Sequence, residues 1–397
     1  MTAPRVILAL ILCCGAGQSV LGRTGTMDHW IRLTNALFSN YTKDIYPVYY
    51  LNETLTVDLS MFLLSIQDFD EVAGVITLNG GLLQSWADFR LTWNPSDYGG
   101  IEDIFLNSSV VWKPHVILVS SAEDLKPFDS GKFDVRVFYN GTCQINPGRR
   151  MLATCSVDMT KFPSDSHVCD LEIMQWSVLP DEVVLGFTST ELILTYYIQN
   201  GEWDIVKTSV SNPTLSPGGV IFTINVTRKP EYLSVSLILP ILLVCFLNPF
   251  VFLLPASSGE RISYTLTLFL SLAVYISIIA SSLPNVSNNM AMMSFFLLII
   301  LIISGVIIVM TIFTLRYDVI SDVSKFPNFL KRLALCIYEK KPVNKDECEK
   351  DANVNSDDTE HDLKRDDVIK LIDISLFVTS SLMMVIFVTW FLCFVFV

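Results

Sequence analysis

The residues whose spacing could support chemistry in this chain lie in one apolar stretch, 259–284. Six side chains, four of them with hydroxyl groups, recur there at steps of three and four: Ser263, Thr267, Leu270, Val274, Ser277 and Ser281. On an α-helix this spacing forms one narrow stripe. A weakly polar stripe on an apolar helix suits a helix that lines a water-filled membrane pore. Small hydroxyl side chains in membrane helices also mediate helix packing, and the spacing alone leaves that alternative open.

A charged residue at one end of this stretch could select the ions that pass. Glu260 and Arg261 directly precede the stripe. A ring of carboxylates at a pore mouth favours cations, so Glu260 is the candidate selectivity residue. The face of the helix opposite the stripe is expected to be apolar and to hold Leu266, Phe269, Leu272, Ile276 and Ile279.

Four apolar segments could place such a helix in a bilayer. The chain has 397 residues, of which 51% are hydrophobic, and its mean hydropathy is +0.48. These values exceed what a soluble protein shows and fit several membrane spans. We expect spans at about 233–255, 260–283, 291–315 and 371–397. The net charge of −13 argues against nucleic acid as a partner.

The first residues predict which side of the membrane each segment occupies. Residues 1–22 contain Arg5, an apolar run too short to span a bilayer, and then small residues, which is typical of a secretory signal peptide. Residues 23–231 are therefore expected outside the cell. With three spans in 232–315 and a fourth in 371–397, the loop 316–370 is expected inside and the C-terminus outside.

The loop 316–370 is consistent with a cytosolic position. Its basic residues concentrate between 325 and 341, as the positive-inside rule expects. Val319–Tyr338 is amphipathic and is predicted to lie as a helix along the inner membrane surface. Lys345–Glu360 is polar and without periodicity, so we expect it to be disordered.

Residues 23–231 are predicted to form an extracellular β-sandwich of immunoglobulin-like topology, preceded by a short helix at Met27–Ser39. Runs of alternating or β-branched residues are separated by turn signals such as Asn79-Gly80-Gly81. Many short strands at this spacing favour a sandwich over a parallel sheet. The expected strands are Leu55–Ile66, Val75–Leu83, Phe133–Tyr139, Val183–Phe187, Leu192–Ile198 and Val220–Val226.

Sequons and cysteines in this region suit an extracellular glycoprotein. The candidate glycosylation sites are Asn40, Asn52, Asn107, Asn140 and Asn225. A sixth sequon, Asn285, lies close to the membrane. The region also contains Cys143, Cys155 and Cys169. Disulfides persist outside the cell, so one pair and one free thiol are expected.

The segment from Cys155 to Cys169 carries the strongest motif. The thirteen residues between the two cysteines include Phe162, Pro163 and Asp165. Together with four spans, this segment resembles that of the Cys-loop receptors, the pentameric ligand-gated ion channels. The resemblance covers nearly the whole chain, although the family usually has Gln at the position of His167.

Other motifs look most like nicotinic acetylcholine receptor subunits. They are Trp86–Trp93, Trp112–Pro114, Asn200–Asp204 and Leu254–Arg261. The resemblance implies a β-sandwich on a four-helix membrane bundle and a Cys155–Cys169 disulfide. It also implies five identical or related subunits around a pore in the plasma membrane, possible placement at a postsynaptic membrane, and contact with the lipid bilayer.

The resemblance implies roles for the pore residues. Glu260 matches the carboxylate ring of the branch that passes cations, and Leu270 matches the central hydrophobic gate, which closes by dewetting. Ser263 and Thr267 match the narrow hydroxyl rings. Ser281 stands where nicotinic-type channels have an acidic residue, which leaves calcium permeation open.

The resemblance also implies residues that couple agonist binding to gating. Glu71 and Arg228 resemble the pair that links the binding domain to the pore. The alternative is a plain surface ion pair worth under ~1 kcal/mol. Phe162 and Pro163 are expected to press on the loop Leu283–Asn289 between the second and third spans, and Asp165 is a further coupling candidate.

The agonist site is where the sequence departs from the family. Family sites hold a cationic amine in an aromatic cage between subunits. Trp176 matches the principal-face tryptophan, Trp86 is assigned to the complementary face, and Tyr197 is a further candidate contact. Val119 stands where a tyrosine is usual, and 204–221 contains neither tyrosine nor adjacent cysteines. We therefore expect a small-molecule agonist other than acetylcholine in its usual geometry, and Trp176 could instead be a packed core residue.

No enzyme, metal or cofactor motif is present. The four histidines lie far apart, at His29, His115, His167 and His361. The chain contains no glycine-rich phosphate loop or nucleophile elbow. We expect a subunit of a cation-selective ligand-gated channel, as a homopentamer or heteropentamer. An accessory subunit without its own agonist and a non-conducting membrane receptor remain alternatives.

Overall fold

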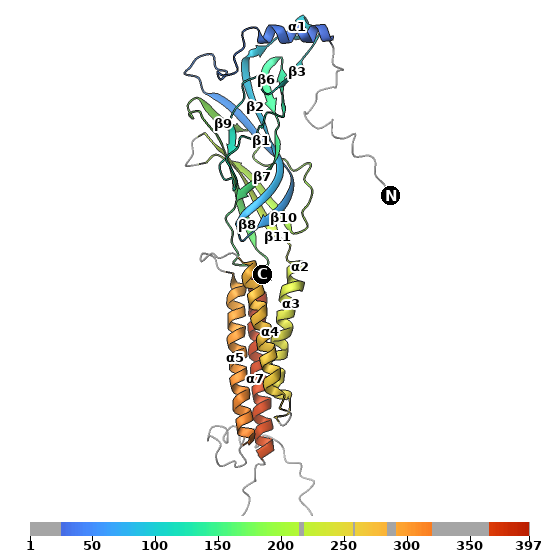
Figure 1. Ribbon diagram of the computed structural model, residues 1–397, viewed down its shortest axis with the longest axis vertical. Helices are drawn as coiled ribbons and strands as arrows, with labels where there is room; N and C mark the ends of the chain where they lie inside the picture. The colour runs from blue at the N-terminus through green and yellow to red at the C-terminus, as the bar shows by residue number, and fades with distance from the viewer. Residues whose placement is uncertain (1–24, 214–217, 257–258, 284–290, 320–364, 397) are drawn as a thin grey trace, which may run out of the picture.

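The computed structural model describes residues 25–213, 218–256, 259–283, 291–319 and 365–396. A β domain stands on a bundle of long helices, and both share one long axis (Figure 1). The signal peptide, the amphipathic and disordered segments predicted within 320–364, and Asn285 lie outside the described residues.

The β domain consists of two sheets. In the larger sheet the strand order is β3-β5-β6-β2-β1-β9, and β7 also pairs with β2; in the smaller it is β10-β11-β8-β4. The strands are β1 (Leu55–Asp70), β2 (Val75–Thr92), β3 (Asp103–Asn107), β4 (Val116–Leu118), β5 (Asp134–Phe138), β6 (Asn140–Ile145), β7 (Gly148–Thr154), β8 (Ser166–Gln175), β9 (Val183–Phe187), β10 (Trp203–Ser211) and β11 (Val220–Arg228). The expected β-sandwich is confirmed.

Alternation along the strands builds one core between the two sheets. In β2 every second residue from Ile76 to Asp88 is buried, because successive side chains of a strand point to opposite faces. The predicted strand at Leu192–Ile198 is wrong. There only isolated bridges form, from Ile193 and Ile198 to β1.

Helix α1 (Met27–Phe38) covers the end of the β domain that is distant from the bundle (Figure 1). The helix begins with a capping box, in which Thr26 accepts from the backbone N–H of His29 and the His29 side chain accepts from the backbone N–H of Thr26. Leu33 anchors the helix, since its side chain is fully buried in the sandwich core.

Four helical segments are long and apolar enough to cross a membrane. They are Glu231–Leu253, Arg261–Ser281, Met292–Arg316 and Ile369–Val395. The first comprises α2 (Glu231–Leu233), η2 (Ser234–Ile238), α3 (Leu239–Leu247) and η3 (Asn248–Leu253); the others belong to α4 (Arg261–Ser282), α5 (Met292–Val319) and α7 (Arg365–Phe396).

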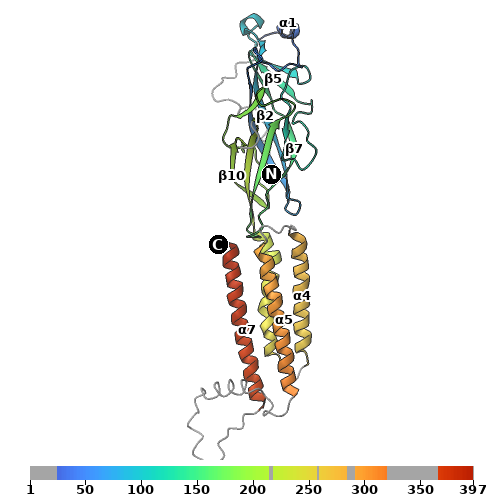
Figure 2. The same ribbon diagram turned by 90° about the vertical axis from the view of Figure 1, so that its left-hand side faces the viewer.

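The helices run side by side, with α5 between α4 and α7 (Figure 2). Pro249 interrupts the first segment, and the neighbouring Asn248 is buried there. Its amide donates to the Ser304 hydroxyl of α5 at 2.6 Å, which ties the irregular turn to a neighbouring helix. The C-terminal end of α7 lies at the end of the bundle that meets the β domain (Figure 1).

Candidate gating and ligand sites

Arg228 ends β11 at the junction between the two domains, and two acidic side chains surround it. Its Nε donates to Asp165 Oδ1 at 2.8 Å, and its Nη2 donates to Glu71 Oε1 at 2.5 Å and to Asp165 Oδ2 at 3.1 Å. The Arg228 side chain is 9% exposed and that of Asp165 is fully buried. The pair predicted from the sequence is therefore a buried network rather than a surface ion pair.

His167 completes this network from the same strand as the disulfide. Its Nε2 lies 2.5 Å from Asp165 Oδ2, while its Nδ1 accepts the backbone N–H of Asp158 at 3.2 Å. Because Nδ1 accepts, Nε2 carries the ring proton and donates a hydrogen bond to the carboxylate. Burial opposes ionisation of Asp165, but the hydrogen bonds from His167 and Arg228 outweigh it and lower the pKa of that carboxyl.

Aromatic rings enclose the Arg228 guanidinium. It lies 4.3 Å from the ring centroid of Trp203 and 5.6 Å from that of Phe162. Trp203 faces Arg228 because the two residues are directly paired between β10 and β11. We did not anticipate contacts of Trp203 or His167 from the sequence. The sequence did hold one indication that His167 would contact Asp165: residues two apart in an extended segment point to the same face.

The loop closed by the Cys155–Cys169 disulfide reaches the membrane helices. Phe162 is 4% exposed and packs with Met159 in the same hydrophobic cluster as Leu283 and Met293. The backbone N–H of Met292, the first residue of α5, donates to Thr160 O at 3.3 Å. Phe162 and Pro163 were expected to press on the loop Leu283–Asn289. Residues 284–290 of that loop lie outside the described residues, but Leu283 on one flank belongs to the same hydrophobic cluster and Met292 on the other bonds to Thr160.

The predicted stripe of α4 lies on its unpacked side. The six stripe residues, from Ser263 to Ser281, are all exposed in the single chain, with Leu270 at 64%. Leu272 and Ile279 are 1% exposed and face the bundle. Leu266 does not lie on that packed face as expected: it is 51% exposed beside the stripe, because residues four apart share a helix face. Glu260 is also exposed.

Arg261 points away from Glu260 and into the bundle. Its Nη1 and Nη2 donate to the two carboxylate oxygens of Asp373 in α7, at 3.0 and 2.6 Å, and its Nε donates to Leu254 O at 2.7 Å. The Arg261 side chain is 2% exposed. We did not predict this bidentate pair, although an acidic residue inside an apolar span signals a buried partner.

The candidate ligand residues are only partly brought together. Trp176 is 50% exposed just after β8, so it is not a packed core residue. The backbone N–H of Val119 donates to Glu172 O at 2.8 Å, so Val119 lies beside Glu172 in β8. Glu172 precedes Trp176 by four residues, or roughly 13 Å of strand. Both residues therefore border the smaller sheet, Val119 after β4 and Trp176 after β8.

Trp86 and Tyr197 lie elsewhere. Trp86 is 3% exposed, and its ring is packed edge-on against Trp112 in the core, because its position in β2 faces inward. This placement contradicts the expected ligand contact. Tyr197 is half-buried next to Ile198, which bridges to Ser65 in β1 of the larger sheet, whereas Trp176 follows β8 of the smaller sheet.

The remaining cysteine of the β domain is not surface-accessible. Cys143 is a fully buried free thiol on β6, and burial raises the pKa of its thiol. Within the described ranges, no group of three His, Cys, Asp or Glu side chains is arranged to hold a metal ion.

Comparisons with known proteins match both domains. The neurotransmitter-gated ion-channel ligand binding domain matches residues 31–230, and the neurotransmitter-gated ion-channel transmembrane region matches residues 237–368. The chain is 29% identical over 300 residues to neuronal acetylcholine receptor subunit alpha-5 of Pan troglodytes, covering 72% of this chain and 64% of the relative.

Two human proteins give similar matches. Neuronal acetylcholine receptor subunit alpha-3 is 28% identical over 295 residues, with 72% of this chain and 57% of the relative covered. Subunit alpha-5 is 29% identical over 278 residues, with 69% of this chain and 59% of the relative covered. The chain thus spans less than two thirds of the length of each of these relatives.

Proposed function

The chain belongs to the neurotransmitter-gated ion-channel family, the Cys-loop receptors of nicotinic type, and on that premise we propose that it is one subunit of a cation-selective pentameric channel. Members of this family are ligand-gated channels and not enzymes. The observation that carries the proposal is the α4 stripe, whose weakly polar side chains face away from the bundle of their own subunit. Five such faces around one axis would enclose a water-filled path.

Cation selectivity is proposed from the charges at the start of α4. Glu260 is exposed, whereas the adjacent Arg261 is turned inward and paired with Asp373. Since Asp373 pairs with Arg261 inside the bundle, the ring facing the permeating ion would be formed by Glu260 rather than by Arg261. Leu270, higher in the stripe, would form the dewetting gate.

Gating would pass through the buried network at the domain junction. Arg228 follows directly from the smaller sheet into the first membrane segment, and it holds Glu71 and Asp165 together. Phe162, three residues before Asp165, packs among the membrane helices. A ligand-induced shift of the smaller sheet would therefore move Arg228 and the disulfide loop together against α5.

The agonist is proposed to be a small molecule other than acetylcholine in the usual cage. Trp176 is exposed and could meet a ligand, but Val119 supplies no aromatic ring and Trp86 lies in the core. The same observations favour an accessory subunit that completes a site with a related partner. Expression alone in oocytes with a screen of transmitters separates the two, because surface protein without current would favour the accessory role.

The topology is also a proposal. The β domain and the C-terminal end of α7 would lie outside the cell and the loop 316–370 inside, in the plasma membrane and, for a synaptic receptor, postsynaptically. Four apolar segments and the family support a multi-pass membrane protein.

The selectivity proposal is tested by the reversal potential after tenfold dilution of external sodium chloride. A cation-selective pore should shift toward negative potentials, by at most about 59 mV. Replacing Glu260 by Ala, with Pro-Ala inserted before Arg261, should abolish or reverse the shift, because the carboxylate ring is lost. The control is Glu231→Gln, which removes an acidic side chain at the other end of the membrane domain. An unchanged shift in the Glu260 variant would contradict the proposal.

A further inference from the structure

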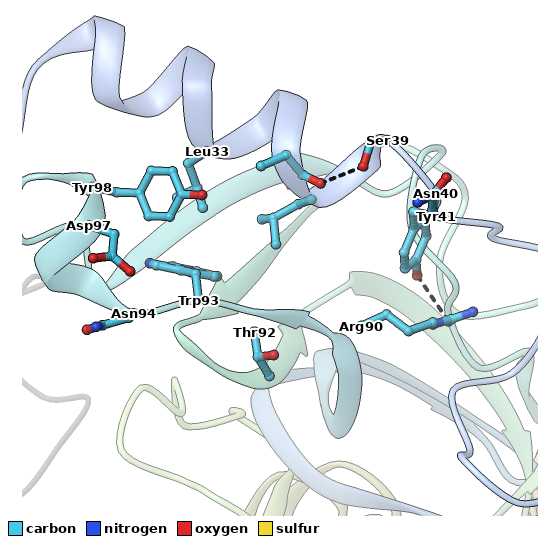
Figure 3. Close-up of a pocket in the computed structure, with 12 residues that line it drawn as sticks. Leu33, Ser39, Asn40, Tyr41, Arg90, Thr92, Trp93, Asn94, Asp97 and Tyr98 are labelled. Carbon is cyan, nitrogen blue, oxygen red and sulfur yellow. Dashed lines mark hydrogen bonds between the residues drawn. The ribbon is translucent and has the colours of Figure 1, made fainter.

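A cavity of about 520 Å³ lies between α1 and the chain that follows β2, at the end of the β domain distant from the membrane helices. This volume lies within the range of roughly 300–1,000 Å³ for small-ligand sites. Figure 3 shows Asn40 and Tyr41 at one end of the cavity, Trp93 and Tyr98 at the other, and Leu33 above them. None of these residues belongs to the gating or ligand sites.

The aromatic rings around this cavity are held in place by their polar ends or by neighbouring charges. Tyr41 donates its hydroxyl to Asp88 Oδ2 at 2.9 Å, and the Arg90 guanidinium lies 4.5 Å from its ring centroid. Trp93 Nε1 donates to Ile101 O at 2.7 Å. The Arg32 guanidinium lies 5.4 Å from the Tyr98 centroid. The rings are therefore preorganised, as a binding site requires.

The chemistry of the lining suits a sugar. Pyranose rings pack their C–H faces on aromatic rings, while their hydroxyl and acetamido groups need hydrogen-bonding partners. Besides the three aromatic rings, the cavity is lined by the amide of Asn94 and the carboxylate of Asp97. A lipid chain would leave these polar groups without partners.

The sequence has an attachment site for such a sugar at the rim. Asn40 is exposed in the turn after α1, lines the cavity, and begins the sequon Asn40-Tyr41-Thr42. A sugar attached to Asn40 needs little intrinsic affinity, because tethering gives it a high effective concentration at the cavity. The middle residue of the sequon, Tyr41, is itself one of the aromatic walls.

We propose that the cavity is the seat of the N-glycan on Asn40, whose core N-acetylglucosamine packs between Tyr41, Trp93 and Tyr98 and fastens α1 to the sandwich. The proposal rests on the extracellular placement of the β domain, since only then does the sequon meet the glycosylation machinery.

The test uses the full-length receptor purified from eukaryotic cells. Thr42→Ala removes the sequon without replacing a cavity residue, and the Thr42 carbonyl that accepts from Arg90 is retained. Thr42→Ser retains the sequon and is the matched control. Asn52→Gln removes another exposed sequon. Glycopeptide mass spectrometry measures occupancy at Asn40 and Asn52, and hydrogen exchange measures the protection of α1.

The expected result is an occupied Asn40 and α1 amides that exchange roughly three- to tenfold faster in Thr42→Ala, the change that loss of one aromatic contact produces. Thr42→Ser and Asn52→Gln should leave α1 unchanged. Tyr98→Ser should also speed exchange, and adding Thr42→Ala to it should have little further effect, because both remove the same contact.

The proposal is overturned by an empty Asn40 beside an occupied Asn52, by equal α1 exchange in Thr42→Ala and Thr42→Ser, or by independent effects of Thr42→Ala and Tyr98→Ser. If no sequon were occupied, the extracellular placement would fail together with this proposal. The two failures are therefore distinguishable.

Discussion

A carboxylate is stable without solvent only when donors surround it, and Asp165 has them from two sides. Arg228 approaches through Nε and Nη2, and His167 through Nε2. The resemblance indicated the part played by Asp165 and Arg228, but not that His167 would hold the same carboxylate. The proton on His167 Nε2 is fixed by a backbone N–H nine residues away, which no local pattern reveals.

Asp165→Asn should destabilise the protein strongly. The variant leaves Arg228 buried with one acidic partner fewer, and breaking a buried ion pair costs about 3–5 kcal/mol. Asp204→Asn is the matched control, because Asp204 is 59% exposed and pairs with Lys229 on the surface. That change should cost under about 1 kcal/mol. Thermal unfolding of detergent-solubilised protein gives both values, and equal losses would refute the role of burial.

The same variant should alter the pH dependence of stability. Because the folded pKa of Asp165 is lowered, its stabilising contribution is present above its unfolded pKa of about 3.9 and is lost as pH falls through the folded value. The melting temperature of the unmodified protein should therefore fall more steeply below about pH 4 than that of Asp165→Asn. If the melting temperatures of the two proteins fell by the same amount between pH 7 and pH 3, ionised Asp165 would not contribute to stability.

At the scale of elements, the period of the sequence was enough to predict which side chains share a face, wherever one face of the element is buried. The stripe of α4 and the alternation of β1 and β2 could be predicted because each residue type recurs at the period of its element. Trp86 could not be placed, since a one-residue change of strand register moves a side chain from the surface to the core. The Arg261–Asp373 pair joins residues 112 positions apart, which a single sequence cannot reveal.

Asp373→Asn should weaken the contact between α4 and α7. It leaves the Arg261 charge buried without its bidentate partner, so we expect a large loss of surface receptor, measured by antibody labelling of intact cells. Lys370→Gln changes an exposed charge near the start of the same helix and is the control.

The double change Arg261→Met with Asp373→Leu should restore surface delivery, because apolar side chains of similar volume replace a buried ion pair at little cost. Failure of the double variant together with normal delivery of Asp373→Asn would show that this pair does not hold the two helices.

At the scale of the whole molecule, the order of segments predicted the architecture well. An acidic, sequon-bearing β region followed by four apolar segments indicated a β-sandwich on a helical bundle, and both are confirmed. The order of segments in one chain could not predict sites that lie between subunits. Whether Trp176 meets a ligand, and which residues of a neighbour complete the site, depends on surfaces that a single chain leaves exposed.

The most direct test of the account is the resting current of cells that express Leu270→Thr, either alone or with related subunits. If α4 lines the pore, a hydroxyl at the gate hydrates it, and a standing cation current should appear without agonist. Leu298→Thr makes the same change at an exposed position of α5 and should add no current. A silent Leu270→Thr receptor at normal surface density would contradict the claim that α4 encloses an ion path.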